Sequence, residues 1–235
     1  LIMSRILITG GAGFIGSHLT EFLSKKYFVT VIDNLSHGNK IKSENKRIKI
    51  IKGDVRDQEL ISYYSKNCKT IYHLAAVLGV DIVSNKNVET MNCEFEGIKN
   101  VCNAAKKNKI RKIIYSSSSG VYGKLNYSKN VKENATIAPV SAYSISKRAC
   151  EFYLKSFYKE NKITSIAVRL FNVYGPRQDE RMVVSRFISQ AKNNKPITIY
   201  GSGKQTRDFT YIDDCVKVFD LIDRKVNGFQ IVNSS

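Results

Sequence analysis

Short apolar runs alternate with amphipathic stretches along the chain up to about residue 170. Ile6, Leu7 and Ile8 run together without alternation, which is typical of a strand buried on both faces of a sheet. Such runs predict strands at 5–9, 27–32, 48–51, 70–73, 112–116 and 165–169. Apolar residues at helical spacing predict helices at 14–26, 90–107 and 142–159. This alternation favours an α/β fold with a doubly wound parallel sheet covered on both faces.

The regular alternation of apolar runs and amphipathic stretches ends after Asn172. Gly175 and Pro176 indicate a turn. Beyond it the pattern predicts helices at 183–192 and 213–223 and strands at 197–200 and 229–232. We therefore expect a Rossmann-type domain over 1–172 and a smaller C-terminal lobe over 173–235, interleaved with the sheet.

Composition fits one sizeable core, because 43% of the 235 residues are hydrophobic. No stretch approaches the roughly 20 apolar residues that span a bilayer, so we expect no membrane contact. The first residues lack a signal-peptide layout, which favours a cytoplasmic location. The five cysteines are dispersed without a C-x-x-C pair, which argues for reduced thiols and no metal site.

A formal net charge of +18 raises the question of a nucleic-acid partner. The lysines are spread along the chain, however, and no dense basic run is interleaved with aromatic residues. We expect biased composition, with some attraction for anionic substrates, and no nucleic-acid partner.

A glycine-rich segment follows the first predicted strand and opens the first predicted helix. Residues 10–16 read GGAGFIG, which contains G-x-G-x-x-G in the required strand–turn–helix context. Glycines let the backbone approach a pyrophosphate, and a helix N-terminus offers free N–H groups and a positive dipole end. The predicted contacts with a dinucleotide are Gly10, Gly13, Phe14, Ile15 and Gly16.

Asp33 ends the second predicted strand, about 20 residues after the glycines. A carboxylate there can accept hydrogen bonds from both ribose hydroxyls and repels a 2′-phosphate. NAD is therefore favoured over NADP, with Asp33 and the adjacent Asn34 at the ribose.

A tyrosine and a lysine, Tyr143 and Lys147, stand four residues apart in a predicted helix and so share one face. An ammonium group beside a phenol lowers the phenol's pKa from about 10 towards neutrality and makes a general base. This spacing is common by chance. Four serines at 116–119, however, end the fifth predicted strand, at the edge where open α/β sheets bind ligands.

These segments together resemble the extended short-chain dehydrogenase/reductases, in particular the NAD-dependent nucleotide-sugar epimerase/dehydratase branch. The resemblance is carried, in the family's order, by 9–16 (TGGAGFIG), 53–55 (GDV), 73–76 (HLAA), 116–123 (SSSSGVYG), 143–147 (YSISK), 169–176 (RLFNVYGP) and 207–214 (RDFTYIDD).

The resemblance implies a role for each matching residue. Ser118, Tyr143 and Lys147 match the catalytic triad. Asp54 and Val55 match adenine contacts. Further implied cofactor contacts are Leu74, Ala75, Ala76, Asn92, Ser116 and Phe171. Implied substrate contacts are Ser118, Asn172, Tyr200 and Arg207, with Arg207 at the nucleotide diphosphate. His73 is interpreted as structural.

The resemblance also bears on the reaction. Family dehydratases carry an Asp-Glu pair directly after the triad serine or threonine, and family UDP-glucuronate decarboxylases carry a glutamate at the second position. Here the two positions are Ser119 and Gly120. A UDP-glucose 4-epimerase-like activity is therefore favoured. A decarboxylase or 4,6-dehydratase stays open, and a non-catalytic nucleotide- or RNA-binding protein is a remote alternative.

The resemblance implies three further features. The substrate is a nucleotide-diphosphate sugar, most simply a UDP-sugar. The helices that begin near Thr90 and Ala142 resemble those of the family's four-helix bundle, so we expect a homodimer. Met91, Phe95, Phe152 and Tyr153 are candidates either for that face or for the core. Family members usually continue beyond the position of Ser235, so we expect the C-terminal lobe to be partial.

Overall fold

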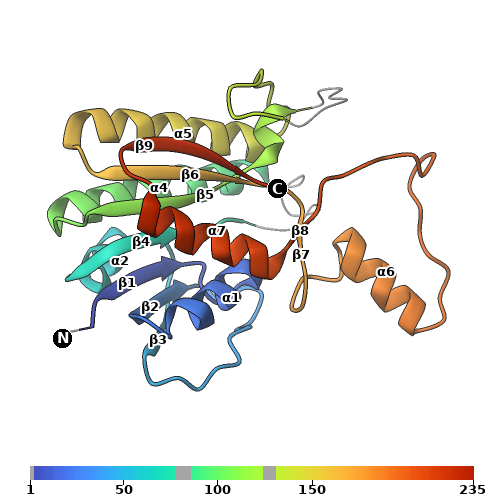
Figure 1. Cartoon of the computed structure of the whole chain (residues 1–235), viewed down its shortest axis with the longest axis horizontal. Helices are drawn as coiled ribbons and strands as arrows, with labels where there is room; N and C mark the ends of the chain where they lie inside the picture. Colours follow the sequence, from blue (N-terminus) through green and yellow to red (C-terminus); the bar gives the residue numbers. More distant parts are fainter. Residues whose placement is uncertain (1–2, 78–85, 124–130) are drawn as a thin grey trace.

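The computed structural model describes residues 3–77, 86–123 and 131–235 and shows an open parallel sheet of seven strands (Figure 1). The strands are β1 (Arg5–Thr9), β2 (Phe28–Asp33), β3 (Ile48–Lys52), β4 (Cys68–His73), β5 (Lys112–Ser118), β6 (Thr164–Leu170) and β9 (Phe229–Ser234). Their spatial order is β3-β2-β1-β4-β5-β6-β9, and every neighbouring pair is parallel. The predicted doubly wound α/β fold is confirmed.

The strand order reverses between β1 and β4. From β1 the chain builds outwards to β2 and β3, then returns to pair β4 with the other side of β1. Neighbouring connections leave β1 and β4 in opposite directions, which opens a crevice at the carboxyl ends of these strands. The glycine turn and His73 both lie at this point.

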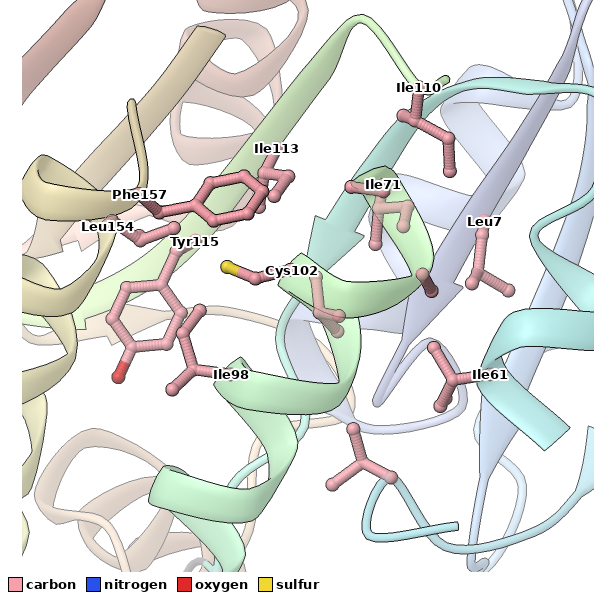
Figure 2. Close-up of a cluster of buried hydrophobic side chains, with 14 of the residues drawn as sticks. Leu7, Ile61, Ile71, Ile98, Cys102, Ile110, Ile113, Tyr115, Leu154 and Phe157 are labelled. Atoms are coloured by element: carbon pink, nitrogen blue, oxygen red, sulfur yellow. The ribbon is translucent and has the colours of Figure 1, made fainter. Parts of the chain in front are cut away.

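Helices cover both faces of the sheet. They are α1 (Phe14–Leu23), α2 (Gln58–Tyr64), α4 (Asn87–Lys107), α5 (Ala142–Asn161) and α7 (Ile212–Lys225), while a further helix, α6 (Val183–Lys192), covers neither face. Successive strand residues point to opposite faces. Leu7 therefore packs in a core with α2, α4 and α5, whereas Ile6 and Ile8 pack in a second core with α1 and α7. Figure 2 shows the first core, in which Ile71 and Ile113 of the strands lie near Cys102 of α4.

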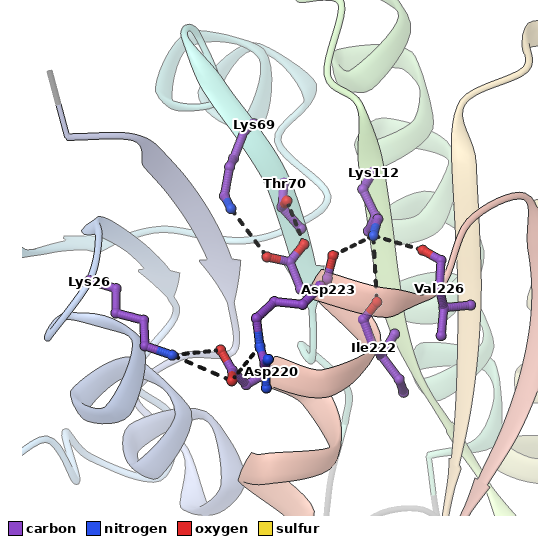
Figure 3. A network of polar contacts seen from close by, with 9 residues as sticks. Lys26, Lys69, Thr70, Lys112, Asp220, Ile222, Asp223 and Val226 are labelled. Atoms are coloured by element: carbon purple, nitrogen blue, oxygen red, sulfur yellow. Dashed lines mark hydrogen bonds and ion pairs between the residues drawn. The ribbon is translucent and has the colours of Figure 1, made fainter. Parts of the chain in front are cut away.

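A polar network fixes α7 to the amino ends of β4 and β5 (Figure 3). The ammonium group of the buried Lys112 donates to the carbonyl of Val226 at 2.8 Å and also reaches the carbonyl of Ile222. The Asp223 carboxylate accepts from Thr70 at 3.0 Å. A cation is favourable where a helix presents unpaired carbonyls at its C-terminus. This network lies at the opposite edge of the sheet from the crevice.

The C-terminal part differs from the sequence prediction. Ile197 and Ile199 alternate with polar residues, which predicted a strand at 197–200, but that prediction is wrong. This segment pairs with no described strand, and Ile199 is 65% exposed. A second, two-stranded sheet instead joins β7 (Val173–Tyr174) to β8 (Thr210–Tyr211). Figure 1 shows α6 standing beside the main sheet, and none of its residues is buried.

Among the described α-helices, α2 lies outside the elements predicted from the sequence. Helix α2 begins after Asp57, whose carboxylate accepts from the backbone N–H of Leu60. Its central residue Ile61 is fully buried in the first core. The capping aspartate was a usable signal, but seven residues are too few for helical periodicity to be distinctive.

Candidate active site

The glycine turn between β1 and α1 is packed so tightly that Gly10 and Gly16 leave no room for a side chain. Gly10 has a φ of +70°, and a Cβ there would stand 2.6 Å from the backbone nitrogen of Ala75. A Cβ on Gly16 would stand 2.1 Å from the carbonyl oxygen of Gly10. The turn, the start of α1 and the segment after β4 therefore meet backbone to backbone, as the glycine pattern predicted.

The N-terminus of α1 is open to an anion. Gly13 occupies the N-cap position and makes no side-chain cap, and the first turn holds no acidic residue. The N–H groups of Phe14, Ile15 and Gly16 have no carbonyl within the helix to pair with. These groups and the helix dipole suit a phosphate at the mouth of the crevice.

Asp33 ties the end of β2 to the glycine turn. One carboxylate oxygen accepts from the N–H of Ala12 at 3.0 Å and the other from the N–H of Leu35 at 2.8 Å. Each oxygen keeps a further lone pair, so the carboxylate can still accept from two ribose hydroxyls. Asn34 is exposed and accepts from the N–H of Ser36, which shapes the following turn.

The segment after β3 holds the two predicted adenine contacts. Asp54 forms a two-point ion pair with Arg56, at 2.7 and 2.9 Å, and the hydrogen bonds from Arg56 lower the pKa of the Asp54 carboxyl. Val55 is buried, and its carbonyl accepts from Asn100 of α4 at 3.1 Å. The N–H of Gly53 donates to the carbonyl of Asp33 at 3.0 Å, which holds this segment next to the carboxyl end of β2.

The segment after β4 runs alongside the glycine turn. Leu74 donates from its backbone to the carbonyl of Thr9 at 2.9 Å, and the N–H of Ala75 lies 3.5 Å from the Thr9 hydroxyl. Ala76 is half-buried and Asn92 of α4 is exposed. Leu74 and Ala75 thus stand where the glycine turn opens, and the contact of Asn92 with a cofactor stays a prediction.

The predicted triad residues come together at the carboxyl edge of β5. A capping box of Ser141 and Ser144 starts α5 and places Tyr143 in its first turn. Ser118, the last residue of β5, accepts from the N–H of Gly120 at 3.1 Å, and its hydroxyl lies close enough to the Tyr143 hydroxyl to lower the pKa of Tyr143. The ammonium nitrogen of Lys147 lies 5.4 Å from the centre of the Tyr143 ring and donates to the carbonyl of Ser116 at 2.8 Å.

The electrostatics of Tyr143 differ from the sequence expectation. Burial raises the pKa of the Tyr143 hydroxyl above its ordinary value, while the charge of Lys147 and the hydrogen bond with Ser118 lower it. Glu94 of α4 adds to the rise. In the free protein the net direction is upward, so the expected fall towards neutrality is not found. Lys147 acts as predicted, but burial and Glu94 outweigh it.

His73 is buried and neutral. Its Nδ1 lies 2.7 Å from the Thr9 hydroxyl, and burial together with the charge of Lys147 lowers its pKa to about 3. The ring lies against Tyr115, with centroids 5.5 Å apart. His73 thus links β1 to β4 beneath the crevice, which agrees with its interpretation as structural.

Two glutamates beneath the triad were missed by the sequence reasoning. Glu94 is fully buried and forms an ion pair with Lys147 at 2.9 Å. Glu151 is also fully buried, and it accepts from Ser117 at 2.6 Å and pairs with Arg169. A signal for Glu94 was present, because Ile98, four residues on, belongs to the core face of α4.

The predicted contacts after β6 divide into two groups. Phe171, predicted at the cofactor, and Asn172, predicted at the substrate, follow β6: the Phe171 ring is tilted against Tyr122 with centroids 6.1 Å apart, and Asn172 donates to the carbonyl of Asp208 at 2.8 Å. Tyr200 and Arg207 lie in the segment between α6 and β8 instead. The Tyr200 hydroxyl accepts from Arg186, and the exposed Arg207 donates to the carbonyl of Thr206. No contact recorded among the described residues joins these two to the triad.

A glycine turn at the switch point of a doubly wound sheet defines a Rossmann-type dinucleotide-binding protein. The family model of the NAD dependent epimerase/dehydratase family matches residues 6–233. The chain therefore belongs to this family of NAD-dependent enzymes, and the resemblance drawn from its motifs is confirmed.

Its relatives catalyse different reactions. The chain is 35% identical over 96% of its length to a dTDP-D-glucose 4,6-dehydratase of Dictyostelium discoideum, of which it spans 56%. It is 37% identical over 97% of its length to a UDP-N-acetyl-alpha-D-glucosaminuronate decarboxylase of Bacillus cytotoxicus, of which it spans 74%. A solved UDP-N-acetylglucosamine 4-epimerase of Methanobrevibacter ruminantium, in complex with UDP-N-acetylmuramic acid, superposes with a TM-score of 0.93 at 35% identity, over 100% of this chain and 77% of that one.

The residues present fit NAD. The two glycines leave room only for backbone, the first turn of α1 is uncapped, and Asp33 stands at the end of β2. A dinucleotide needs these three features at its pyrophosphate and ribose. No helix within residues 3–77, 86–123 and 131–235 is long and apolar enough to cross a membrane.

Proposed function

We propose that the protein is an NAD-dependent nucleotide-sugar epimerase of the UDP-glucose 4-epimerase type. One observation carries the proposal. The side chains of Ser118 and Lys147 both act on Tyr143 at the carboxyl edge of the sheet, with the Lys147 ammonium nitrogen 5.4 Å from the centre of the Tyr143 ring and bonded to the carbonyl of Ser116. This arrangement suits removal of a proton from a sugar hydroxyl.

Each triad residue has a separate task in this proposal. Tyr143, as the phenolate, accepts the proton of the sugar hydroxyl at its phenolic oxygen and later returns it. Ser118 donates a hydrogen bond to the same sugar oxygen and holds it in place. Lys147 stabilises the phenolate by its charge. NAD held in the crevice would supply a hydride acceptor and donor at sugar C4, and return of hydride to the other face of the 4-keto sugar would give the epimer.

The cofactor contacts proposed for NAD follow the geometry of the crevice. The first turn of α1 would hold the pyrophosphate, and Asp33 would accept from the ribose hydroxyls. Asp54 and Val55 would border the adenine. The remaining proposed contacts are Leu74, Ala75, Ala76, Asn92, Ser116 and Phe171.

The side chains around the triad support epimerisation over elimination or decarboxylation. Ser119 and Gly120, which follow the triad serine, have no side chain that exchanges a proton at neutral pH. Glu94 and Glu151 are both fully buried and ion-paired, to Lys147 and Arg169. A carboxylate held in this way is not free to act as acid or base on a sugar.

The substrate proposed is a nucleotide-diphosphate sugar, most simply a UDP-sugar. Arg207 carries a planar guanidinium whose fork geometry suits a diphosphate, and it forms no ion pair recorded among the described residues. Tyr200 and Asn172 are proposed to contact the same substrate. Replacing Arg207 by Met is expected to raise the KM for the nucleotide sugar and to leave the Kd for NAD unchanged.

The test is incubation of the protein with NAD⁺ and a panel of UDP-, GDP- and dTDP-sugars, followed by NMR of the products. Inversion at C4 without loss of water or carbon dioxide is the expected result. A 4-keto-6-deoxy sugar would indicate a dehydratase, and loss of carbon dioxide from a hexuronate would indicate a decarboxylase. These two reactions are the second candidates, because relatives of both kinds are 35% and 37% identical to the chain.

We also propose a homodimer through α4 and α5. Their outer face exposes Phe95 by 38%, Phe152 by 61% and Tyr153 by 40%. A hollow of about 260 Å³ lies between the two helices and is lined by Phe95, Ile98, Lys99, Ala149, Cys150 and Tyr153. Two copies of these helices would form a four-helix bundle. Sedimentation of Phe152→Lys is expected to show a monomer, and a parent protein that is itself monomeric contradicts this proposal.

A further inference from the structure

A buried ion pair lies behind the proposed general base. Glu94 Oε1 is 2.9 Å from the Lys147 ammonium nitrogen, and both side chains are at most 1% exposed. Among the effects of Glu94 on Lys147, its charge contributes most to raising the Lys147 pKa. The other Glu94 oxygen accepts from the Tyr115 hydroxyl at 2.7 Å.

This arrangement fixes the Lys147 ammonium group from three sides. It donates to the carbonyl of Ser116, pairs with Glu94 and lies 4.6 Å from the centre of the Tyr115 ring. Burying two charges is costly, and a neutral pair of similar shape often gives an equally stable protein. Stability alone therefore gives no reason for a carboxylate at this position.

Resting on the proposed function, we propose that Glu94 is a positioning residue that counters the charge of Lys147 and thereby sets the pH at which Tyr143 gives up its proton. Lys147 favours the phenolate, and a carboxylate 2.9 Å from its ammonium nitrogen cancels part of that effect. The direction of the Tyr143 pKa agrees, since Glu94 raises it and Lys147 lowers it.

The other ionisable groups around this cluster are neutral near pH 7. His73 of β4 has a pKa of about 3, and burial raises the pKa of the Cys93 thiol of α4 to about 11 and that of the Cys150 thiol of α5 to about 12. The Tyr115 hydroxyl of β5 has a pKa well above its ordinary value. Among the described groups that act on Tyr143, Glu94 is therefore the anion and Lys147 the cation.

The test is Glu94→Gln, which removes the charge and keeps the shape. Ultraviolet difference titration of the free protein, with Tyr143→Phe as the subtraction, is expected to show the Tyr143 pKa lowered by about one unit or more. The acidic limb of the pH profile of turnover is expected to shift in the same direction. An unchanged or raised Tyr143 pKa in folded Glu94→Gln overturns the inference.

Tyr115→Phe is the matched control. It removes the hydrogen bond to Glu94 and keeps both charges, so a merely structural role predicts the same effect as Glu94→Gln, whereas charge control predicts a much smaller shift. Should Glu94→Gln fail to fold, Glu94→Asp keeps the charge and withdraws it by one methylene. A smaller downward shift is then expected, and no shift overturns the inference.

The two proposals fail separately. The titration needs neither NAD nor sugar, so it reports on Glu94 even if no sugar nucleotide is turned over. Turnover with an unmoved Tyr143 pKa in Glu94→Gln leaves the proposed function in place and removes the role of Glu94.

Discussion

Arg169 and Glu151 meet in a two-point ion pair beneath the triad, with Nε–Oε1 and Nη2–Oε2 both at 2.8 Å. Both side chains are fully buried. The same carboxylate accepts from Ser117 of β5, and the same guanidinium donates to Tyr122, which follows the triad serine. One ion pair thus joins α5, β5 and β6 around Ser118.

Breaking this pair is expected to destabilise the protein strongly. Arg169→Met leaves the Glu151 carboxylate without its main partner in the core, and the expected loss of unfolding free energy is about 3–5 kcal/mol. Urea denaturation measures it. Arg148→Met is the control, because Arg148 pairs with the same carboxylate but is 37% exposed, and its loss should cost less than about 1 kcal/mol. Equal losses in the two variants contradict the interpretation.

The proposed general base gives a second prediction. Tyr143→Phe removes the hydroxyl and keeps the ring, so turnover is expected to fall by at least about 10²–10⁴-fold while NAD still binds. Product NMR and calorimetric titration with NAD measure the two quantities. Tyr63→Phe, which changes an exposed tyrosine of α2, should leave both unchanged. Full turnover in Tyr143→Phe would falsify the proposed mechanism.

The glycine turn gives a third prediction. Gly16→Ala brings a Cβ to 2.1 Å from the Gly10 carbonyl oxygen, so the start of α1 must shift and NAD binding is expected to be lost. Gly38→Ala is the control. Gly38 has a φ of +72° and open space around it, so the change should cost about 1–2 kcal/mol of stability and leave NAD affinity intact. Calorimetric titration measures the Kd for NAD in both variants. If Gly16→Ala binds NAD with the affinity of the parent protein, the glycine turn is not the NAD site.

The buried His73 predicts a loss of stability in acid. Its pKa is about 3 in the folded protein and about 6.5 when unfolded, so between these values the unfolded chain binds the extra proton. The stability that His73 contributes is present above about pH 6.5 and falls with pH by up to about 1.4 kcal/mol per unit towards pH 3.

Urea denaturation, repeated between pH 7 and pH 4 at intervals of about half a pH unit, measures how the unfolding free energy changes with pH. His73→Asn removes the titrating group and is expected to flatten the curve. His37→Asn, which changes an exposed histidine, should leave the curve as in the parent protein. An unchanged slope in His73→Asn means that another group takes up the proton.

Much of the fold was predictable from local pattern. The buried strands can be recognised as continuous apolar runs, because a strand covered on both faces carries apolar residues on both of them. The helices that cover them carry apolar residues at helical spacing. The segment 197–200 shows the limit of this reasoning, since alternation predicts a strand only if a partner strand lies beside it.

The sequence predicted which residues form the candidate site better than it predicted their pKa values. Tyr143 and Lys147 lie on one helix turn, so their proximity follows from spacing alone. The pKa of Tyr143 depends instead on how deeply α5 packs and on Glu94, which comes from another helix. Burial and charges from distant segments have no local signature in the sequence.

By itself, the sequence determined the class of fold, the glycine turn for a dinucleotide and the pairing of a tyrosine with a lysine, because each depends on neighbours within a few residues. Only the tertiary structure decided that Ser118 meets Tyr143, that Glu94 pairs with Lys147 and that Arg169 meets Glu151 beneath them. These contacts depend on the order of the strands and the depth of helix packing, which the burial of apolar surface by the whole chain sets.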